Sequence, residues 1–354
     1  MHVLIVHDAP VDPGSPDQSD GAAQATFVAE SLAVLGHSSE TLACGLDLGA
    51  LRDSIDAAAP DVVFNLVESL GGMGRMIHVV PVLLEALGIP YTGCPAHAVE
   101  ATSDKLAAKR RLVLADIDTP AWHALDDLES AGDEAVDGRW IVKSVWEHAS
   151  IGLDEDSVVE PQSLGGLAQL VRERLPALGG QGFAEAFVDG REFNLALLAA
   201  EAAGSGADPQ VLPPAEIVFE DWPADRPRVV GYRAKWIADS EPYHTTPRCF
   251  AFPPVDEPLI DRLRGLAVRC WRLFGLRGYA RVDFRVDDAG RPYVLEVNSN
   301  PCLAPDAGFV AALTEAGVGP GTAIARILGD VALGSRPTMP LVAAEVRSGR
   351  VRPS

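Results

Sequence analysis

The sequence predicts an α/β protein with a parallel sheet at its N-terminal end and an antiparallel sheet toward its C-terminal end. Over roughly the first 95 residues, short apolar runs alternate with segments of helical period, as in a doubly wound parallel sheet. From about residue 190 onward strands predominate, and two of them flank a turn as a hairpin does. A chain of 354 residues is long enough for several packed units of this kind.

The individual elements follow from apolar periodicity and from the glycines and prolines that end each segment. Strands are expected at residues 3–6, 41–44, 61–67, 89–91, 140–145, 183–188, 192–199, 229–237, 278–287 and 291–298. Helices are expected over residues 21–35, 48–58, 76–87, 104–114, 164–175 and 259–274. The stretch 336–354 mixes Pro, Arg and Ser without periodicity and is expected to be a loosely held tail. No G-x-G-x-x-G motif follows the first strand, which removes the main support for a nicotinamide site.

Composition argues against several classes of function. The formal net charge of −21 argues against general nucleic-acid binding, which requires clustered Lys and Arg. Five scattered cysteines without a C-x-x-C pair fit a reducing compartment better than a disulfide framework or a zinc site. The N-terminal apolar run is too short and too soon charged for a signal peptide, and no apolar stretch approaches the length of a membrane span. We therefore expect a cytoplasmic protein that binds neither nucleic acid nor membrane.

The strongest local signal lies in residues 278–301, GYARVDFRVDDAGRPYVLEVNSNP. If the turn centres on residues 289–290, two polar pairs face each other on one side of a hairpin: Asp283 with Glu296, and Arg281 with Asn298. The alternate positions then form the apolar face, which consists of Val282, Phe284, Leu295 and Val297.

The two opposed carboxylates indicate a metal site. They would destabilise the hairpin unless a cation neutralised them. Because carboxylates with an amide oxygen suit magnesium, Asp283, Glu296 and Asn298 are expected to be its ligands. Arg281 adds a donor for a phosphoryl group or a developing oxyanion. The alternative is a solvated polar face with an Arg–carboxylate ion pair, and a register slip of one residue would scatter the group.

Three lysines lie in or beside apolar elements. Lys143 falls within an expected strand, where burying a lysine is costly without an anion, and a small-residue loop that includes Ser150 follows it. Lys105 opens a helix, whose positive end favours an anion. Lys235 falls within another expected strand. Each could be a solvated lysine by itself, but together with the carboxylates they indicate a bound triphosphate.

Glu185 and Glu192 lie on either side of a glycine-containing turn between two expected strands. Carboxylates near such a turn can accept hydrogen bonds from ribose hydroxyls. On spacing alone, the simpler interpretation is that Glu185 and Glu192 are exposed charged side chains without a ligand.

Taken in order, these motifs resemble the ATP-grasp superfamily, and specifically its D-alanine–D-alanine ligase-like branch, over about residues 60–315. The ordered set is highly specific, above all R-x-D followed by E-x-N before a proline. The matching pieces are VFNLVE at 63–68, PYTG at 90–93, SDK at 103–105, IVK at 141–143, SIG at 150–152, Glu185, GRE at 190–192, AK at 234–235, R-x-D at 281–283 and E-x-N at 296–298.

This resemblance implies an ATP-grasp fold with an N-terminal parallel α/β subdomain over 1–100, a small lid over 101–188 and a C-terminal antiparallel-sheet subdomain over 189–335. ATP would lie between the last two, with Lys105 and Lys143 on its phosphates. Glu185 and Glu192 would contact adenine and ribose, and Ser150 would belong to a lid that excludes water.

The resemblance also implies a metal-assisted reaction. Asp283, Glu296 and Asn298 would hold two magnesium ions, or manganese, on the β- and γ-phosphates. Arg281 would stabilise the transferred phosphoryl group, and Lys235 would reach the γ-phosphate or the acyl phosphate. The substrates would be a small-molecule carboxylate, which is phosphorylated, and an amine, which attacks the acyl phosphate. A homodimer is common among such ligases.

The substrate half of the sequence departs from the family pattern. The first loop reads HDAPVDPG at 7–14 without the usual Gly-rich, Ser- and Glu-containing pattern, and Trp236 stands where tyrosine is usual. Cys302 stands at the usual glycine position, with no serine after it. We therefore expect a ligase with altered specificity for small, amino-acid-derived substrates. Glu68 and Ser69, at the carboxyl end of a strand, are its candidate contacts for an amine or a carboxylate.

Several other interpretations stay open. One is D-alanine–D-alanine ligase itself, another is a carboxylase or acid kinase with the same fold, and a third is a nucleotide-binding regulatory protein without turnover. Retention of the hairpin's polar residues argues against the third. Cys302 is a poor candidate for a nucleophile, because acyl-phosphate chemistry needs none and no histidine lies near it in sequence. His148 is expected to contact the nucleotide or solvent rather than to act as a base.

Overall fold

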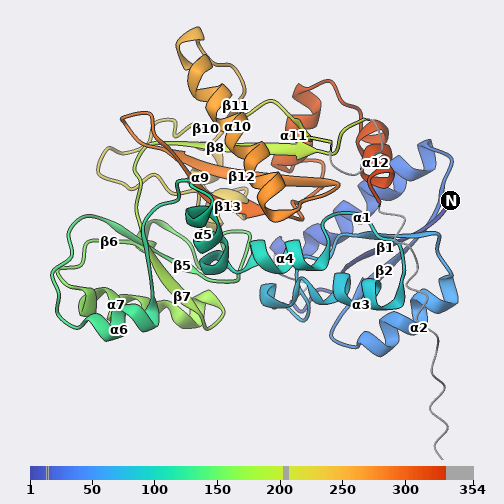
Figure 1. The fold of residues 1–354 in the computed structure, drawn as a ribbon, viewed down its shortest axis with the longest axis horizontal. Helices are drawn as coiled ribbons and strands as arrows, with labels where there is room; N and C mark the ends of the chain where they lie inside the picture. Colours follow the sequence, from blue (N-terminus) through green and yellow to red (C-terminus); the bar gives the residue numbers. More distant parts are fainter. Residues whose placement is uncertain (13, 15, 202–206, 332–354) are drawn as a thin grey trace, which may run out of the picture.

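The computed structural model describes residues 1–12, 14, 16–201 and 207–331, so the tail expected at 336–354 lies outside the described residues. Its mixed α/β architecture is built on three sheets (Figure 1). A parallel three-stranded sheet lies at one end of the molecule, an antiparallel four-stranded sheet at the other, and a six-stranded antiparallel sheet between them. None of the helices in the described ranges has the length and apolarity needed to span a bilayer.

The N-terminal unit is a doubly wound sheet, as predicted. It contains β1 (His2–Asp8), α1 (Pro16–Val34), β2 (Ser38–Cys44), α2 (Leu48–Ala58), β3 (Val62–Asn65), a 3₁₀ turn (Gly74–Met76) and α3 (Val79–Leu87). The strands are parallel in the order β2-β1-β3. Successive residues of β1 enter different cores, because Val3 and Ile5 pack with α1 while Leu4 and Val6 pack with α2 and α3. Helices therefore cover both faces of the sheet.

Two consecutive helices, α4 (Ala96–Ser103) and α5 (Lys105–Leu114), lead from this unit toward the middle of the molecule (Figure 1). Asp104 separates them, and its side chain caps α5 by accepting a hydrogen bond from the backbone N–H of Ala107 at 2.9 Å. The sequence predicted α5 but not α4. Most of α4 is buried, so its sequence lacks the one-sided apolar stripe that reveals a surface helix.

The central unit is a four-stranded antiparallel sheet in the order β4-β7-β5-β6. It contains β4 (Trp122–Ala124), α6 (Leu125–Ala131), β5 (Trp140–Ser144), a 3₁₀ turn (Glu155–Ser157), β6 (Val158–Val159), α7 (Leu164–Arg174), a second 3₁₀ turn (Leu175–Leu178) and β7 (Gly182–Ala186). Helices α6 and α7 pack on one face through a core that includes Leu128, Val142 and Leu167. The opposite face of the sheet is not covered by these helices, and it lines a cleft.

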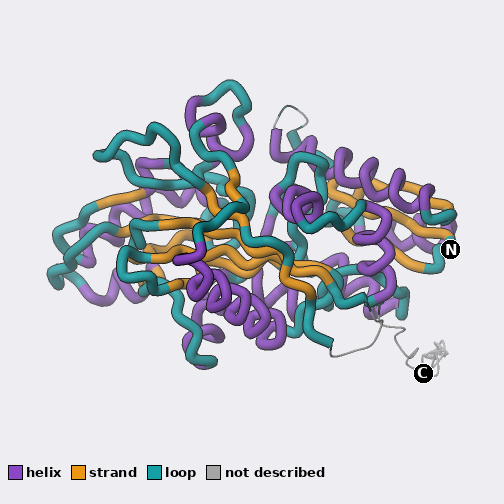
Figure 2. Tube along the Cα trace, turned by 90° about the horizontal axis from the view of Figure 1, so that it is seen from above, coloured by secondary structure: helices purple, strands orange, loops and turns teal. Residues whose placement is uncertain are grey.

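The third sheet has the order β11-β10-β8-β12-β13, with β9 also paired to β8. Its region contains β8 (Arg191–Leu198), β9 (Gln210–Val211), β10 (Ala215–Ile217), α8 (Tyr232–Trp236), α9 (Glu241–His244), β11 (Arg248–Cys249), a 3₁₀ turn (Pro254–Asp256), α10 (Glu257–Phe274), β12 (Tyr279–Val286), β13 (Pro292–Asn298), α11 (Gly308–Glu315) and α12 (Pro320–Gly329). Helices α4, α5 and α10 share a core with one face of this sheet. Figure 2 shows its strands side by side in the middle of the molecule, with the parallel strands near the N-terminus.

The strand predicted at 229–237 is wrong, because Lys235 lies in the short helix α8. The backbone N–H of Tyr232 donates to the carbonyl of Leu153 at 2.8 Å, which ties this segment to the loop after β5 instead of to a sheet. A side chain could not replace Gly231 there, since a Cβ would lie 2.7 Å from the same carbonyl oxygen. The close approach of residues 231–232 to that loop therefore determines the helical conformation of α8. The alternation of apolar residues in the sequence does not reveal this contact.

The predicted hairpin register is confirmed where the polar residues lie. Arg281 pairs with Asn298 and Asp283 pairs with Glu296, but a β-bulge follows, so that Phe284 pairs with Val294. The prediction that Leu295 belongs to the apolar face is therefore wrong. Val294 takes that place in the core, and Leu295 lines the cleft beside Glu296.

Candidate functional site

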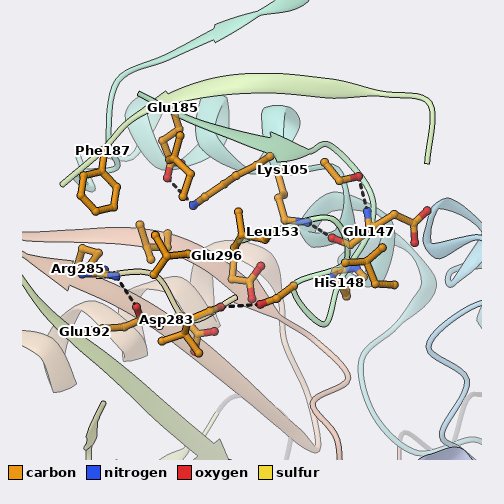
Figure 3. A pocket seen from close by; sticks show the side chains of 18 of the residues that line it. Lys105, Glu147, His148, Leu153, Glu185, Phe187, Glu192, Asp283, Arg285 and Glu296 are labelled. Atoms are coloured by element: carbon orange, nitrogen blue, oxygen red, sulfur yellow. Dashed lines mark hydrogen bonds and ion pairs between the residues drawn. The ribbon is translucent and has the colours of Figure 1, made fainter. Parts of the chain in front are cut away.

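A cleft of about 900 Å³, solvent at its mouth included, lies between the uncovered face of the four-stranded sheet and the polar face of the six-stranded sheet (Figure 3). Most of the predicted site residues come together in its lining, although they come from five separate stretches of the chain. These residues are Lys105, Lys143, Ser150, Glu185, Glu192, Lys235, Asp283 and Glu296. Arg281 and Asn298 lie beside them in the hairpin, and Glu68 lines a neighbouring cavity.

A buried carboxylate on β7 is held between two lysines. Glu185 Oε1 lies 2.6 Å from Lys143 Nζ on β5, and Glu185 Oε2 lies 2.5 Å from Lys109 Nζ on α5. Burial by itself would raise the pKa of Glu185, but the two ammonium groups lower it below its usual value. The carboxylate is therefore ionised and fixed in orientation.

Sequence reasoning missed Lys109, whose side chain is 1% exposed. Two features could have revealed it. Lys109 follows Lys105 by four residues on one helix, which places both on the same face. The chain also contains only four lysines, at 105, 109, 143 and 235, and three of them had already been selected.

Lys105 is buried at the start of α5, and its Nζ donates to the carbonyl of Glu147 at 2.8 Å. Burial lowers the pKa of Lys105, although the charge of Glu296 opposes the shift. An anion bound in the cleft would favour the charged form.

The loop after β5 has an unusual backbone. Ala149, Ser150 and Gly152 all have positive φ, of 58°, 60° and 69°, and left-handed residues in such a loop can direct N–H groups toward an anion. The Ser150 hydroxyl donates to the carbonyl of Val230 at 2.9 Å, and Trp236 Nε1 donates to the carbonyl of Ala149 at 2.8 Å. The loop is thus fastened to the segment that carries Lys235.

The hairpin carboxylates are in different electrostatic surroundings. Arg281 donates to both oxygens of Asp283, at 2.7 and 2.8 Å, and its Nη2 lies 3.9 Å from Glu296 Oε1. Burial raises the pKa of Asp283 despite the adjacent guanidinium. Burial also acts to raise the pKa of Glu296, but Lys105 and Lys235 lower it well below its usual value. The Arg–carboxylate ion pair of the alternative interpretation is therefore present, but the face is not solvated, since the side chains of Arg281 and Asp283 are 17% and 8% exposed.

The same hairpin also fits a hard divalent cation. Asp283 and Glu296 offer carboxylate oxygens, and Asn298 offers an amide oxygen that already accepts from the backbone N–H of Asn300 at 3.0 Å. Among the described residues no cluster of three or more His, Cys, Asp or Glu side chains forms a metal site. Oxygen donors of this number suit magnesium, which usually takes its remaining ligands from phosphate and water.

A further ion pair lies on the side of the cleft formed by the six-stranded sheet, between β12 and β8. Arg285 Nη2 lies 2.8 Å from Glu192 Oε2, and Arg285 Nη1 donates to the carbonyl of Gly190 at 3.1 Å. Sequence reasoning missed Arg285 as well. The alternation that selected Arg281 and Asp283 predicts that the next residue but one, Arg285, faces the same side of β12.

A second cavity of about 670 Å³ adjoins the cleft and shares Glu147, His148 and Ile151 with it. Glu68 and Ser69 lie in its wall, as does Asp8 at the end of β1. Asp8 accepts hydrogen bonds from the Glu68 N–H and the Ser69 hydroxyl, each at 2.7 Å. Burial, with a contribution from Asp8, raises the pKa of Glu68 to about 8, and burial raises the pKa of Asp8 to about 6.

Cys302 lies close to this second cavity, and its Sγ donates to Asp20 Oδ2 at 2.7 Å. Burial, together with Glu68 and Asp20, raises the pKa of the thiol far above its usual value. Because the thiolate is the nucleophilic form, these contacts argue against a nucleophilic role, in agreement with the sequence-based expectation.

The chain matches the family model described as "D-ala D-ala ligase C-terminus" over residues 122–329. It is 33% identical to uncharacterized protein y4sG of Sinorhizobium fredii, over 83% of this chain and 82% of that protein. It is 31% identical to D-alanine–D-alanine ligase of Moorella thermoacetica, over 81% of this chain and 87% of that enzyme.

Solved structures show the same fold. The D-alanine–D-alanine ligase of Bacillus anthracis complexed with ATP superposes with a TM-score of 0.66 at 18% identity, covering 93% of this chain and 96% of that one. The D-alanyl-alanine synthetase A of Vibrio cholerae superposes with a TM-score of 0.69 at 16% identity, covering 93% and 98%.

Proposed function

The chain belongs to the D-alanine–D-alanine ligase family of ATP-grasp enzymes and is an ATP-dependent ligase, and we propose that it joins a small carboxylate to an amine other than the D-alanine pair. The observation that carries the proposal is the contrast between the two cavities. The cleft contains the lysines and carboxylates that suit a nucleotide. The second cavity is lined by acidic side chains and by Trp236 and part of the 7–14 loop, which depart from the family's substrate pattern.

In the proposed reaction, a carboxylate oxygen of the first substrate takes the γ-phosphoryl group of ATP, and ADP leaves. The amine nitrogen then attacks the acyl carbon, the bond to the phosphate oxygen breaks, inorganic phosphate leaves with the electron pair, and the nitrogen loses a proton. ATP would lie in the cleft, with Lys105 and Lys143 at its phosphates. Glu185 and Glu192 would contact the adenine and the ribose.

The hairpin would carry the charge that develops during transfer. Asp283, Glu296 and Asn298 would hold two magnesium ions, or manganese, as the family implies. When bound, the metal neutralises phosphate charge. Arg281 would bind the transferred phosphoryl group, and Lys235 the γ-phosphate or acyl phosphate. The loop with Ser150 would exclude water and so protect the acyl phosphate from hydrolysis.

The division of the chain at 1–100, 101–188 and 189–335 stays a prediction, as do a cytoplasmic location and a homodimer. The enzyme should also bind neither nucleic acid nor membrane. D-alanine–D-alanine ligase activity itself is the nearest competing assignment, because relatives that cover most of this chain carry that name.

The test is ADP release with Mg-ATP against pairs of D- and L-amino acids, β-amino acids, diamines and small carboxylates, with mass spectrometry of each mixture. We expect ADP and a product one water lighter than the summed substrates, both lost in Glu296→Gln. Condensation of D-alanine with itself as the best reaction would contradict the altered specificity. ADP without a condensed product would favour an acid kinase, and ATP binding without turnover would favour a regulatory protein.

A further inference from the structure

The second cavity has an unusual balance of charge. Asp8, Asp20, Glu68 and Glu147 all line it, and no Lys or Arg is among the described residues of its wall. Burial raises the pKa of all four carboxyl groups, although Arg281 opposes the shift at Glu68 and Lys105 and Arg75 oppose it at Glu147 from outside the wall. An amino acid with one ammonium group brings an equal negative charge, so it would add no net compensation. Buried carboxylates without a cation are costly, which favours a ligand with excess positive charge.

Three of these carboxylates have an oxygen to which no described residue donates a hydrogen bond: Glu68, Asp20 and Glu147, whose Oε2 accepts from the Gly74 N–H at 3.3 Å. Both oxygens of Asp8 already accept hydrogen bonds within the protein, one from the Glu68 N–H and one from the Ser69 hydroxyl. Glu68 Oε1 accepts one hydrogen bond, from Gln24 Nε2 at 2.9 Å. Asp20 Oδ2 accepts a hydrogen bond from the thiol of Cys302. No side chain or backbone N–H in the described part of the chain donates to Glu68 Oε2 or to Asp20 Oδ1.

A histidine supplies an independent indication of a ligand. His148 lines both the cleft and the second cavity, and its Nε2 is shielded from solvent without a hydrogen-bond partner among the described residues. Burial, then the charge of Lys105, lowers the pKa of His148 to about 4, so the ring is neutral. When the proton of the neutral ring is on Nδ1, Nε2 can accept an N–H from an amine, a donor that the described residues do not provide.

We propose that the second cavity binds a substrate with two amino groups, a diamine or a diamino acid, with one ammonium group at Asp20 and the reacting amine near Glu68 and His148. This rests on the proposed ligase function for its chemistry but not for its binding. The second ammonium group provides the selectivity, because a monoamine of the same length leaves Asp20 unpaired.

Binding can be measured without turnover. Isothermal titration of the full chain, with a non-hydrolysable ATP analogue and magnesium, would compare 1,4-diaminobutane with butylamine and lysine with norleucine at constant ionic strength. We expect the diamino member of each pair to bind at least 10-fold more tightly. Asp20→Asn should remove most of this difference, while Asp53→Asn, which removes one exposed charge on α2, should leave it unchanged.

The outcomes separate this inference from the proposed function. Equal affinity within each matched pair in the wild-type protein would overturn the inference, and that comparison needs no variant to fold. Retention of the full difference in a folded Asp20→Asn protein would also overturn it. Diamine selectivity without ADP release, when the panel of carboxylates is supplied with the diamines and Mg-ATP, would support the cavity assignment and contradict the proposed reaction, whereas condensation of monoamino acids without selectivity would do the reverse.

Discussion

Lys109 Nζ lies 2.5 Å from Glu185 Oε2, and both side chains are at most 2% exposed. Removing the lysine leaves a buried carboxylate with Lys143 as its one remaining ammonium partner. Since breaking a buried ion pair in this way typically costs about 3–5 kcal/mol, we expect Lys109→Met to lower the free energy of unfolding by that order. Urea denaturation would measure it.

The matched control is the exposed pair of Arg172 with Glu129, in which both side chains are at least 40% exposed. Arg172→Met should cost less than about 1 kcal/mol. An equal effect of the two substitutions would mean that the Lys109 pair is not a stabilising feature. Lys109→Met should also raise KM for ATP, because Glu185 loses the contact that fixes its second oxygen.

Arg281 should not tolerate lysine. Its guanidinium makes two parallel hydrogen bonds to Asp283, a geometry that an ammonium group cannot reproduce. We expect Arg281→Lys to lower kcat by roughly 10²–10³-fold, as loss of a transition-state donor typically does, with little change in nucleotide affinity. Steady-state kinetics with direct nucleotide titration would separate the two effects. A fall confined to nucleotide affinity would contradict the assigned role.

Glu68 should make the protein less stable as the pH rises. Its pKa is raised from 4.5 to about 8 in the folded protein, so between these values the native state binds more protons than the unfolded state. The free energy of unfolding must then fall with increasing pH, by at most about 1.4 kcal/mol per pH unit. Asp8, whose pKa is raised to about 6, and His148, whose pKa is lowered to about 4, also contribute to the pH dependence near the lower end of the window from pH 6 to 8, so a comparison with a Glu68 variant is needed to isolate Glu68.

Glu68→Gln should therefore flatten the dependence of stability on pH across that window. Chemical denaturation at several pH values, in parallel with the wild-type protein, would measure the difference. Parallel curves for the two proteins would show that Glu68 titrates at its ordinary value.

Gly190 should not tolerate a side chain. A Cβ at this position would lie 2.0 Å from the carbonyl oxygen of Val286, which forces the turn before Glu192 away from β12. We expect Gly190→Ala to destabilise the protein by about 1–3 kcal/mol and to raise KM for ATP. Gly265→Ala is the control, because that position is within α10 with open space around it, and it should stabilise by about 0.5–1 kcal/mol.

Trp236→Phe should uncouple the two steps of the reaction. The phenyl ring lacks the N–H that fastens Trp236 to the carbonyl of Ala149, so the loop should admit water more often. We expect the ratio of ADP to condensed product to rise above that of the wild-type enzyme. Trp222→Phe also removes an indole bond to a carbonyl, that of Arg226, and should leave the ratio unchanged.

How much of this could be predicted from sequence depends on the range of the interactions. The pairing of Asp283 with Glu296 follows from period-2 alternation and a short turn, so local pattern was sufficient. The bulge that turns Leu295 into the cleft depends on packing of Val294 against the core, which a one-strand pattern does not contain. α8 was mistaken for a strand for a similar reason, since the contact that shapes it is with Leu153 far away in sequence.

The acidic cavity illustrates the same limit. Asp8, Asp20 and Glu68 are separated by up to 60 residues, and parallel pairing of β1 with β3 brings two of them together. Sequence placed Glu68 at the carboxyl end of a strand, but it offered no reason to select Asp8 or Asp20. Lys109 differs, because its helical spacing from Lys105 is a local signal that the sequence does contain.

The distribution of lysines has a practical consequence for the study of this enzyme. Of 29 basic residues only four are lysines, and three of them line the cleft while Lys109 holds its Glu185 wall. Reagents that acylate lysine side chains will therefore report on this one region, mainly through Lys143 and Lys235, because Lys105 and Lys109 are buried and arginines do not react. Mass-spectrometric mapping of lysine acetylation, with and without nucleotide, becomes an occupancy assay that needs neither a known substrate nor turnover.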